Sequence, residues 1–200
     1  MSGMWKTISL LLIFGLGSLA CSKGTVAGGT QSGQTTATTP SQNPNGELKY
    51  KAPEGWVEEK PSSSMRTAQY KLPKAAGDAE DASLVLYYFG QGQGGATQAN
   101  IDRWINQMQQ ADGSTSAAKA KSESQTVNGL KVTTVDVSGT YSAEMTPGSG
   151  SFSNNANYRM RAAVIETPKG SYFVKLVGPA RTVAQWDEAF NSYLKSFEFK

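Results

Sequence analysis

Two hairpin signals in the second half of the chain limit its fold more than any other feature. Asn128-Gly129 separates two stretches of strand-forming residues, 118–127 and 130–141, and this dipeptide is the strongest short signal for a two-residue hairpin turn. Residues 158–178 repeat the arrangement around Pro168-Lys169-Gly170. Consecutive hairpins build an antiparallel sheet, because parallel strands need a long crossover connection.

Further strands and a helix are expected upstream of these hairpins. The strands are predicted at 48–52, 65–72 and 83–89, and the last of them is a dense apolar run. A helix is expected to begin at Thr97 and to end at 111–113. Its apolar residues have the i, i+3, i+4, i+7 spacing of an amphipathic helix and are Ile101, Trp104, Ile105 and Met108.

A second amphipathic helix is expected to close the chain. Thr182-Val183-Ala184-Gln185 has the capping-box pattern that opens helices. The core-facing residues that follow this pattern are Val183, Trp186, Phe190, Leu194 and Phe197. Because only one long helical crossover joins the hairpins, we predict an α+β fold over residues 47–200, with an antiparallel sheet covered by two amphipathic helices.

Two segments of this domain resemble a known fold family. They are the turn Ala52-Pro53-Glu54-Gly55-Trp56 after an alternating strand, and the closing pattern from Trp186 through Phe190 to Phe199. Over residues 48–199 the chain resembles the PsbP-like α/β sandwich, and more narrowly the uncharacterised bacterial lipoproteins of that fold. Plant members are lumenal assembly and ion-retention subunits of the oxygen-evolving complex. The resemblance therefore implies non-enzymatic protein binding and no particular chemistry.

The first twenty residues have the pattern of a secretory signal peptide. Lys6 precedes an apolar run at 8–16, which is shorter than the roughly 20 residues that cross a bilayer. The segment ending at Cys21 resembles the bacterial lipobox, although Ser18 stands where that pattern prefers leucine. The resemblance implies lipid attachment at Cys21, and Ser22 after it implies the outer membrane, facing the periplasm. The alternative is ordinary cleavage before Cys21, which would leave a free thiol.

Residues 21–46 are predicted to link this anchor to the domain. After Cys21 the segment consists mainly of Gly, Thr, Ser, Gln and Pro and contains no aromatic residue. Such a composition buries too little apolar surface to offset the entropy of ordering, so we expect a disordered tether.

Composition excludes several classes of function. The sequence has no histidine and one cysteine, Cys21, so we expect no zinc site with nitrogen and sulfur ligands, no internal disulfide and no histidine-based catalytic triad. The formal net charge is +3, and Lys6 and Lys23 account for two of the 19 basic residues, leaving 17 against 16 acidic residues from residue 47 onward. This near balance predicts no nucleic-acid partner. We expect no cofactor, no metal and no catalytic residues.

Three short motifs are better explained by local structure than by a functional site. Gly90, Gly92 and Gly95 form a G-x-G-x-x-G pattern, but no buried parallel strand follows it, so a strand-to-helix connector is the better interpretation than a nucleotide site. Ser192 and Lys195 have S-x-x-K spacing without the motifs that accompany it in penicillin-recognising enzymes. The neighbouring carboxylates of Glu58-Glu59 point to opposite faces of a strand.

Three aromatic residues are candidates for contact with a partner. Tyr87 and Tyr88 lie on opposite faces of the strand at 83–89, and tyrosine suits a surface that is partly apolar and partly wet. Phe152 is an isolated aromatic residue in a Ser-, Gly- and Asn-rich segment at 142–157, which is predicted to be a mobile loop.

These features favour a membrane-anchored envelope lipoprotein that acts as a non-catalytic protein-binding or assembly module. Its partners would be the membrane, through the N-terminal lipid, and an envelope protein. One alternative is a small-ligand carrier, which needs an apolar cavity of at least about 300 Å³. The other is a hydrolase that uses carboxylates or the Ser192–Lys195 pair.

Overall fold

The computed structural model describes residues 47–144 and 150–200. The predicted signal peptide, the lipid-attachment residue Cys21 and the linker at 21–46 lie outside these described residues. The predicted domain at 47–200 is therefore the part of the chain whose fold is described below.

Antiparallel strands dominate the described residues. Ten strands are present there: β1 (Leu48–Lys49), β2 (Val57–Glu59), β3 (Arg66–Leu72), β4 (Ala82–Tyr88), β5 (Met108–Gln109), β6 (Lys121–Val127), β7 (Leu130–Glu144), β8 (Phe152–Thr167), β9 (Gly170–Pro179) and β10 (Glu198–Phe199). Eight of them form one sheet in the order β2-β3-β4-β9-β8-β7-β5, with β6 also paired to β7. The strands β1 and β10 form a separate two-stranded ribbon. All these pairings are antiparallel, as predicted.

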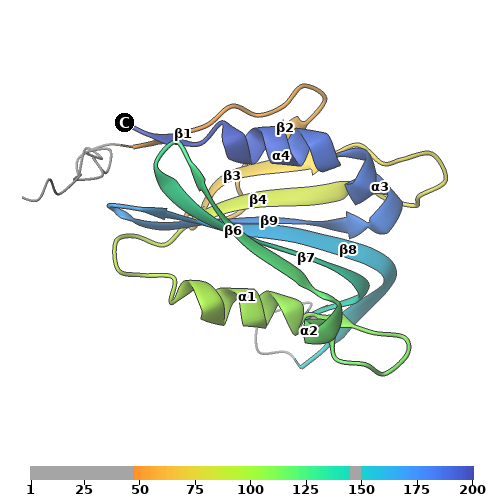
Figure 1. The fold of residues 1–200 in the computed structure, drawn as a ribbon. Coiled ribbons are helices and arrows are strands. Elements are labelled where there is room, and N and C mark those ends of the chain that lie inside the picture. Colours follow the sequence, from red (N-terminus) through yellow and green to blue (C-terminus); the bar gives the residue numbers. More distant parts are fainter. Residues whose placement is uncertain (1–46, 145–149) are drawn as a thin grey trace, which may run out of the picture. The chain divides into compact units, whose positions relative to one another are not determined.

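Helices cover both faces of the sheet (Figure 1). The described helices are α1 (Thr97–Ile105), α2 (Ser116–Lys119), α3 (Ala180–Gln185) and α4 (Asp187–Lys195). On one face α3 and α4 pack over a core that includes Leu84, Leu176 and Phe190. On the other face α1 packs over Met160 and Phe173. The antiparallel sheet with amphipathic helices on it is confirmed, and the helices lie on opposite faces.

Both predicted hairpins are present. Asn128 and Gly129 have φ angles of 48° and 81°, the left-handed values of the turn that suits a two-residue hairpin, and Val127 pairs with Leu130 across it. The β8–β9 hairpin turns between Thr167 and Gly170.

The predicted loop at 142–157 is largely wrong. Pairing of β7 with β8 continues from Tyr141↔Asn155 to Glu144↔Phe152, so residues 142–144 and 152–157 lie in strands. Pairing with a neighbouring strand outweighs the low strand propensity of Ser, Gly and Asn, since that propensity depends strongly on context.

The predicted helix boundaries also differ. The first helix ends at Ile105 rather than at 111–113, because Met108 pairs with Tyr141 at the edge of the sheet. Thr182 does not cap the closing helix but lies inside α3, where its buried hydroxyl donates to Asp78 Oδ2 at 2.6 Å. That side-chain partner belongs to a loop about 100 positions away, which a local capping pattern does not reveal.

Candidate functional site

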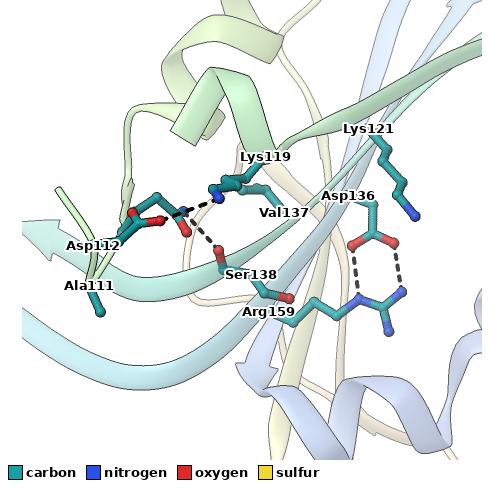
Figure 2. A pocket seen from close by; sticks show the side chains of 9 residues that line it. Ala111, Asp112, Lys119, Lys121, Asp136, Val137, Ser138 and Arg159 are labelled. Carbon is teal, nitrogen blue, oxygen red and sulfur yellow. Dashed lines mark hydrogen bonds and ion pairs between the residues drawn. The ribbon is translucent and has the colours of Figure 1, made fainter. Parts of the chain in front are cut away.

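A polar cleft of about 550 Å³ lies where α2, β6 and the bend of β7 meet (Figure 2). Its charged lining residues are Asp112, Lys119, Lys121, Asp136 and Arg159. Four of these five charged residues form two ion pairs. Lys119 lies 3.3 Å from Asp112, and Arg159 donates to both carboxylate oxygens of Asp136 at 2.8 and 2.6 Å.

The Asp112 carboxylate of the polar cleft is held in its charged form. The hydroxyl and backbone N–H of Ser114, followed by Lys119, lower the pKa of Asp112 to about 2. A general acid at neutral pH needs the opposite shift. The arrangement therefore resembles a set of structural ion pairs more than an acid–base site.

The Arg159–Asp136 pair belongs to a larger network that fixes α4 to the sheet. Arg159 and Arg161 of β8 both donate to the carboxylate of Asp187, which lies in the first turn of α4. The Arg161 guanidinium also lies 4.5 Å from the centre of the Phe190 ring. Charge-assisted hydrogen bonds of this kind order the elements that they join, so the network has a structural explanation.

A second hollow, which we call the α1 groove, runs beside α1. It measures about 690 Å³ and lies between the helix and the far ends of β7 and β8. Its lining residues are Ala99, Asp102, Arg103, Asn106, Gln107, Gln109, Ser142 and Phe152. Phe152 is 56% exposed and is the large aromatic residue on the rim of this groove.

A smaller cavity, the inner pocket, adjoins the α1 groove between α1 and the sheet. It measures about 220 Å³ and shares Arg103 and Gln107 with the groove. Its remaining lining residues are Tyr87, Phe89, Trp104, Phe173 and Lys175. The aromatic rings contact one another, with 6.0 Å between the Tyr87 and Phe89 centroids and 5.5 Å between Phe89 and Phe173.

Lys175 places a charge in this aromatic surrounding. It lies in the central strand β9 between Val85 and Ala162, two buried apolar neighbours in register. Its ammonium group donates to Gln107 Oε1 at 2.6 Å and to the Tyr141 hydroxyl at 2.8 Å. Burial, and to a smaller extent the Arg103 guanidinium, lowers the pKa of Lys175 to about 8.

The structure brings two of the three predicted contact residues together. Tyr87 lines the inner pocket and Phe152 lines the α1 groove, on either side of Arg103 and Gln107. Tyr88 is directed to the opposite face, where its ring stacks on Tyr172 at 4.4 Å and its hydroxyl donates to the Lys169 carbonyl. The third predicted residue is therefore engaged in packing away from this site.

Lys175 is not among the site residues predicted from the sequence. The signal was present, since a single lysine interrupts the apolar run Tyr172-Phe173-Val174-Lys175-Leu176-Val177. A charged residue inside such a run can face solvent or can face polar partners inside the protein, and the sequence pattern alone does not distinguish the two. Here α1 covers this face of the sheet, so Lys175 lies beneath a helix.

The other sequence motifs do not form sites. The glycine loop joins β4 to α1, and β4 pairs only with antiparallel neighbours, so the parallel unit of a nucleotide site is not built there. Gly94 packs against the inner pocket instead, because a Cβ atom there would lie 2.6 Å from the Phe173 ring. Ser192 and Lys195 are both exposed on α4.

The described residues lack two features that would point to a metal site or a membrane span. In 47–144 and 150–200, no cluster of three or more acidic, histidine or cysteine side chains could hold a metal ion. Within those ranges, too, no helix has the length and apolar character needed to cross a membrane.

Comparison with known proteins gives matches at the level of structure. No protein-family model and no curated protein matches the chain. LpqN of Mycobacterium tuberculosis is similar with a TM-score of 0.50 and 11% identity, over 82% of this chain and 87% of LpqN. The protein of unknown function PA94 from Pseudomonas aeruginosa has a TM-score of 0.43 and 13% identity, over 70% and 94% of the two chains.

A PsbP protein, from the family that the sequence resembles, is also among the similar structures. Cyanobacterial PsbP from Synechocystis sp. has a TM-score of 0.41 and 12% identity, over 84% of this chain and 98% of that protein. At 11% identity, the likeness to LpqN shows that this chain and LpqN share a fold.

Proposed function

We propose that this protein is a non-catalytic binding module of the bacterial cell envelope, anchored by a lipid on Cys21 and contacting an envelope protein through the α1 groove. In this proposal the anchor holds the domain at the outer membrane, facing the periplasm. The linker at 21–46 gives the domain reach from that membrane.

The exposed Phe152 ring beside the α1 groove is the observation that carries the proposal. Large apolar rings at the rim of a hollow are typical of protein-binding surfaces, where a few aromatic anchors supply most of the binding energy. The groove also offers Asp102, Arg103 and the amides of Asn106 and Gln107, which suit the polar part of an interface. The polar cleft offers no comparable apolar anchor, since the apolar residues that line it are Ala111 and the buried Val137.

Two further observations support an envelope role. LpqN, which shares the fold, is described as involved in cell envelope biogenesis. The sequence before residue 22 has the pattern of an exported lipoprotein.

Site-specific crosslinking tests the groove. A photoreactive phenylalanine analogue replaces Phe152 in one variant and Met65 in a matched control, since Met65 is a similarly exposed apolar residue, at 52% against 56%. We expect a discrete adduct with one envelope protein from position 152 and none from position 65. Equal adducts from both positions, or none from either, would contradict the proposal.

The anchor has its own test. Mass spectrometry of the natural protein is expected to find Cys21 at the N-terminus carrying acyl chains, and Cys21→Ser is expected to release the protein from membranes. Retention of Met1, or an unmodified Cys21 thiol, would refute the anchor without bearing on the groove.

A further inference from the structure

Lys175 and its surroundings have an unusual balance of charge. Neither Lys175 nor Arg103 forms an ion pair with a carboxylate among the described residues, and no acidic residue lines the inner pocket. A third cation is close, because the Arg66 guanidinium lies 5.7 Å from the centre of the Tyr87 ring. The inner pocket is therefore positive without a counter-charge from these residues.

The ammonium group of Lys175 also has unused hydrogen-bonding capacity. Lysine has three N–H donors, and two of these are taken by Gln107 and Tyr141. In the described part of the chain, the third donor has no acceptor. Lys175 is partly buried and its ammonium lies 4.9 Å from the centre of the Tyr141 ring, but no carboxylate of the described residues pairs with it. A partly buried charge that lacks a counter-charge and lines a cavity is suited to an anionic group from outside.

The shape of the inner pocket restricts what that anion can carry. At about 220 Å³ the cavity lies below the range of roughly 300–1,000 Å³ that drug-sized ligands occupy. Its walls are the rings of Tyr87, Phe89, Trp104 and Phe173, which favour an apolar or aromatic body. The exposed Arg103 at the junction with the α1 groove gives the ligand a path from solvent.

We propose that the inner pocket is a binding site for a compact apolar monocarboxylate, with the carboxylate on Lys175 and Arg103 and the apolar body against the aromatic walls. This site goes beyond the proposed protein-binding role, because it needs only the domain and a small molecule. Lys175 is the anchoring residue, and Arg103 adds charge at the mouth.

Three ligands of the same size test the charge requirement. The purified full chain is titrated by calorimetry with 3-phenylpropionate, with the neutral 3-phenylpropionamide and with the cationic 2-phenylethylamine. We expect the carboxylate to bind with a Kd below about 1 mM and the other two to bind about tenfold more weakly or not at all. Equal binding of acid and amide, or no binding of the acid at millimolar concentration, overturns the proposal.

Variants then locate the site. Lys175→Met is expected to weaken binding of 3-phenylpropionate by about ten- to hundredfold, since a charge-assisted hydrogen bond is lost. Arg103→Gln, at an exposed position where folding is not at stake, is expected to weaken it by about threefold. Lys121→Met is the matched control, because it removes a lysine from the polar cleft. A loss in Lys121→Met, or full affinity in Lys175→Met, places the ligand elsewhere and refutes the site.

A spectroscopic reading separates the inner pocket from other apolar surfaces. Trp104 lines the pocket, whereas Trp56 and Trp186 belong to the core on the other face of the sheet. We expect 3-phenylpropionate to shift the indole N–H resonance of Trp104 and to leave those of Trp56 and Trp186 unchanged. Shifts confined to Trp56 or Trp186 would be incompatible with the proposal.

Discussion

The two faces of the sheet each bury a polar group among aromatic rings, and they surround it differently. Under α4, the Tyr193 hydroxyl is fully buried and has no hydrogen-bond partner among the described residues, within a cluster formed with Tyr50, Trp56, Tyr70 and Phe197. Under α1, the Lys175 ammonium has two partners and lines a cavity.

The difference shows that a polar group among aromatic rings can affect stability alone or can also be available to bind a ligand. Tyr193 is 0% exposed and lines none of the hollows described above, so its hydroxyl adds a desolvation cost without access to a ligand. The charged Lys175 has a larger desolvation cost, but a ligand can reach it from solvent through the opening of the inner pocket beside Arg103. Of the two faces, the α1 face therefore combines a polar group that destabilises the fold with a cavity in which a ligand can bind that group.

The largest expected effect belongs to the sealed face. Phe190 of α4 is 0% exposed and packs in the core against the sheet, with Arg161 over its ring. Phe190→Ala should lower the free energy of unfolding by about 3–5 kcal/mol, because it removes apolar contact and leaves a cavity that rigid neighbours do not fill. Urea unfolding checks this value. A loss below about 1 kcal/mol would mean that this face is not tightly packed.

Lys175→Met should raise the free energy of unfolding, whereas Phe190→Ala lowers it. A fall in pKa from 10.5 to about 8 corresponds to a penalty of roughly 3 kcal/mol for the charged form, and the substitution also removes two hydrogen bonds. We therefore expect a net gain of about 2 kcal/mol at pH 7. A destabilised variant would show that the charge is compensated in the folded protein.

The pH dependence of stability provides the control for that variant. Because the folded protein has the lower pKa, the unfolded chain binds more protons between pH 8 and 10, so wild-type stability should rise with pH in this window. Lys175→Met should lack this rise. Above about pH 10 stability should fall in both proteins, since burial raises the pKa of several tyrosines, including Tyr70 to about 12.

Tyr193→Phe should have the smallest effect and also stabilise. Removal of a buried hydroxyl without a partner avoids its desolvation cost, so we expect a gain of about 1 kcal/mol in thermal unfolding experiments. Burial also raises the pKa of Tyr193, in keeping with a ring sealed from water. A loss of stability would indicate a partner for the hydroxyl and would remove the contrast between the two faces.

Local patterns predicted much of this fold. The left-handed turn of Asn128-Gly129 needs only two residues, and the helical spacing of Ile101, Trp104 and Ile105 identifies the buried side of α1 without reference to the sheet. These features depend on neighbours within a few positions, which is why the sequence reveals them. The predicted end of the first helix was wrong because Met108 pairs with Tyr141 of a strand about 30 positions away. The loop at 142–157 was largely wrong because β7 and β8 continue to pair there, and the start of the closing helix differs because Thr182 bonds to Asp78.

The candidate site shows the same division. Tyr87 and Phe152 were predicted as separate contact residues, and their place on either side of Arg103 follows only from the packing of α1 across β4, β7, β8 and β9.

Sequence by itself determined an antiparallel sheet with amphipathic helices, because turn residues and apolar spacing are encoded locally. Only the tertiary structure decided that a lysine in the middle of an apolar strand lies beneath a helix and beside a cavity. The physical reason is that the low polarity around Lys175 comes from rings on three elements, β4, α1 and β9, whose contact no single segment specifies.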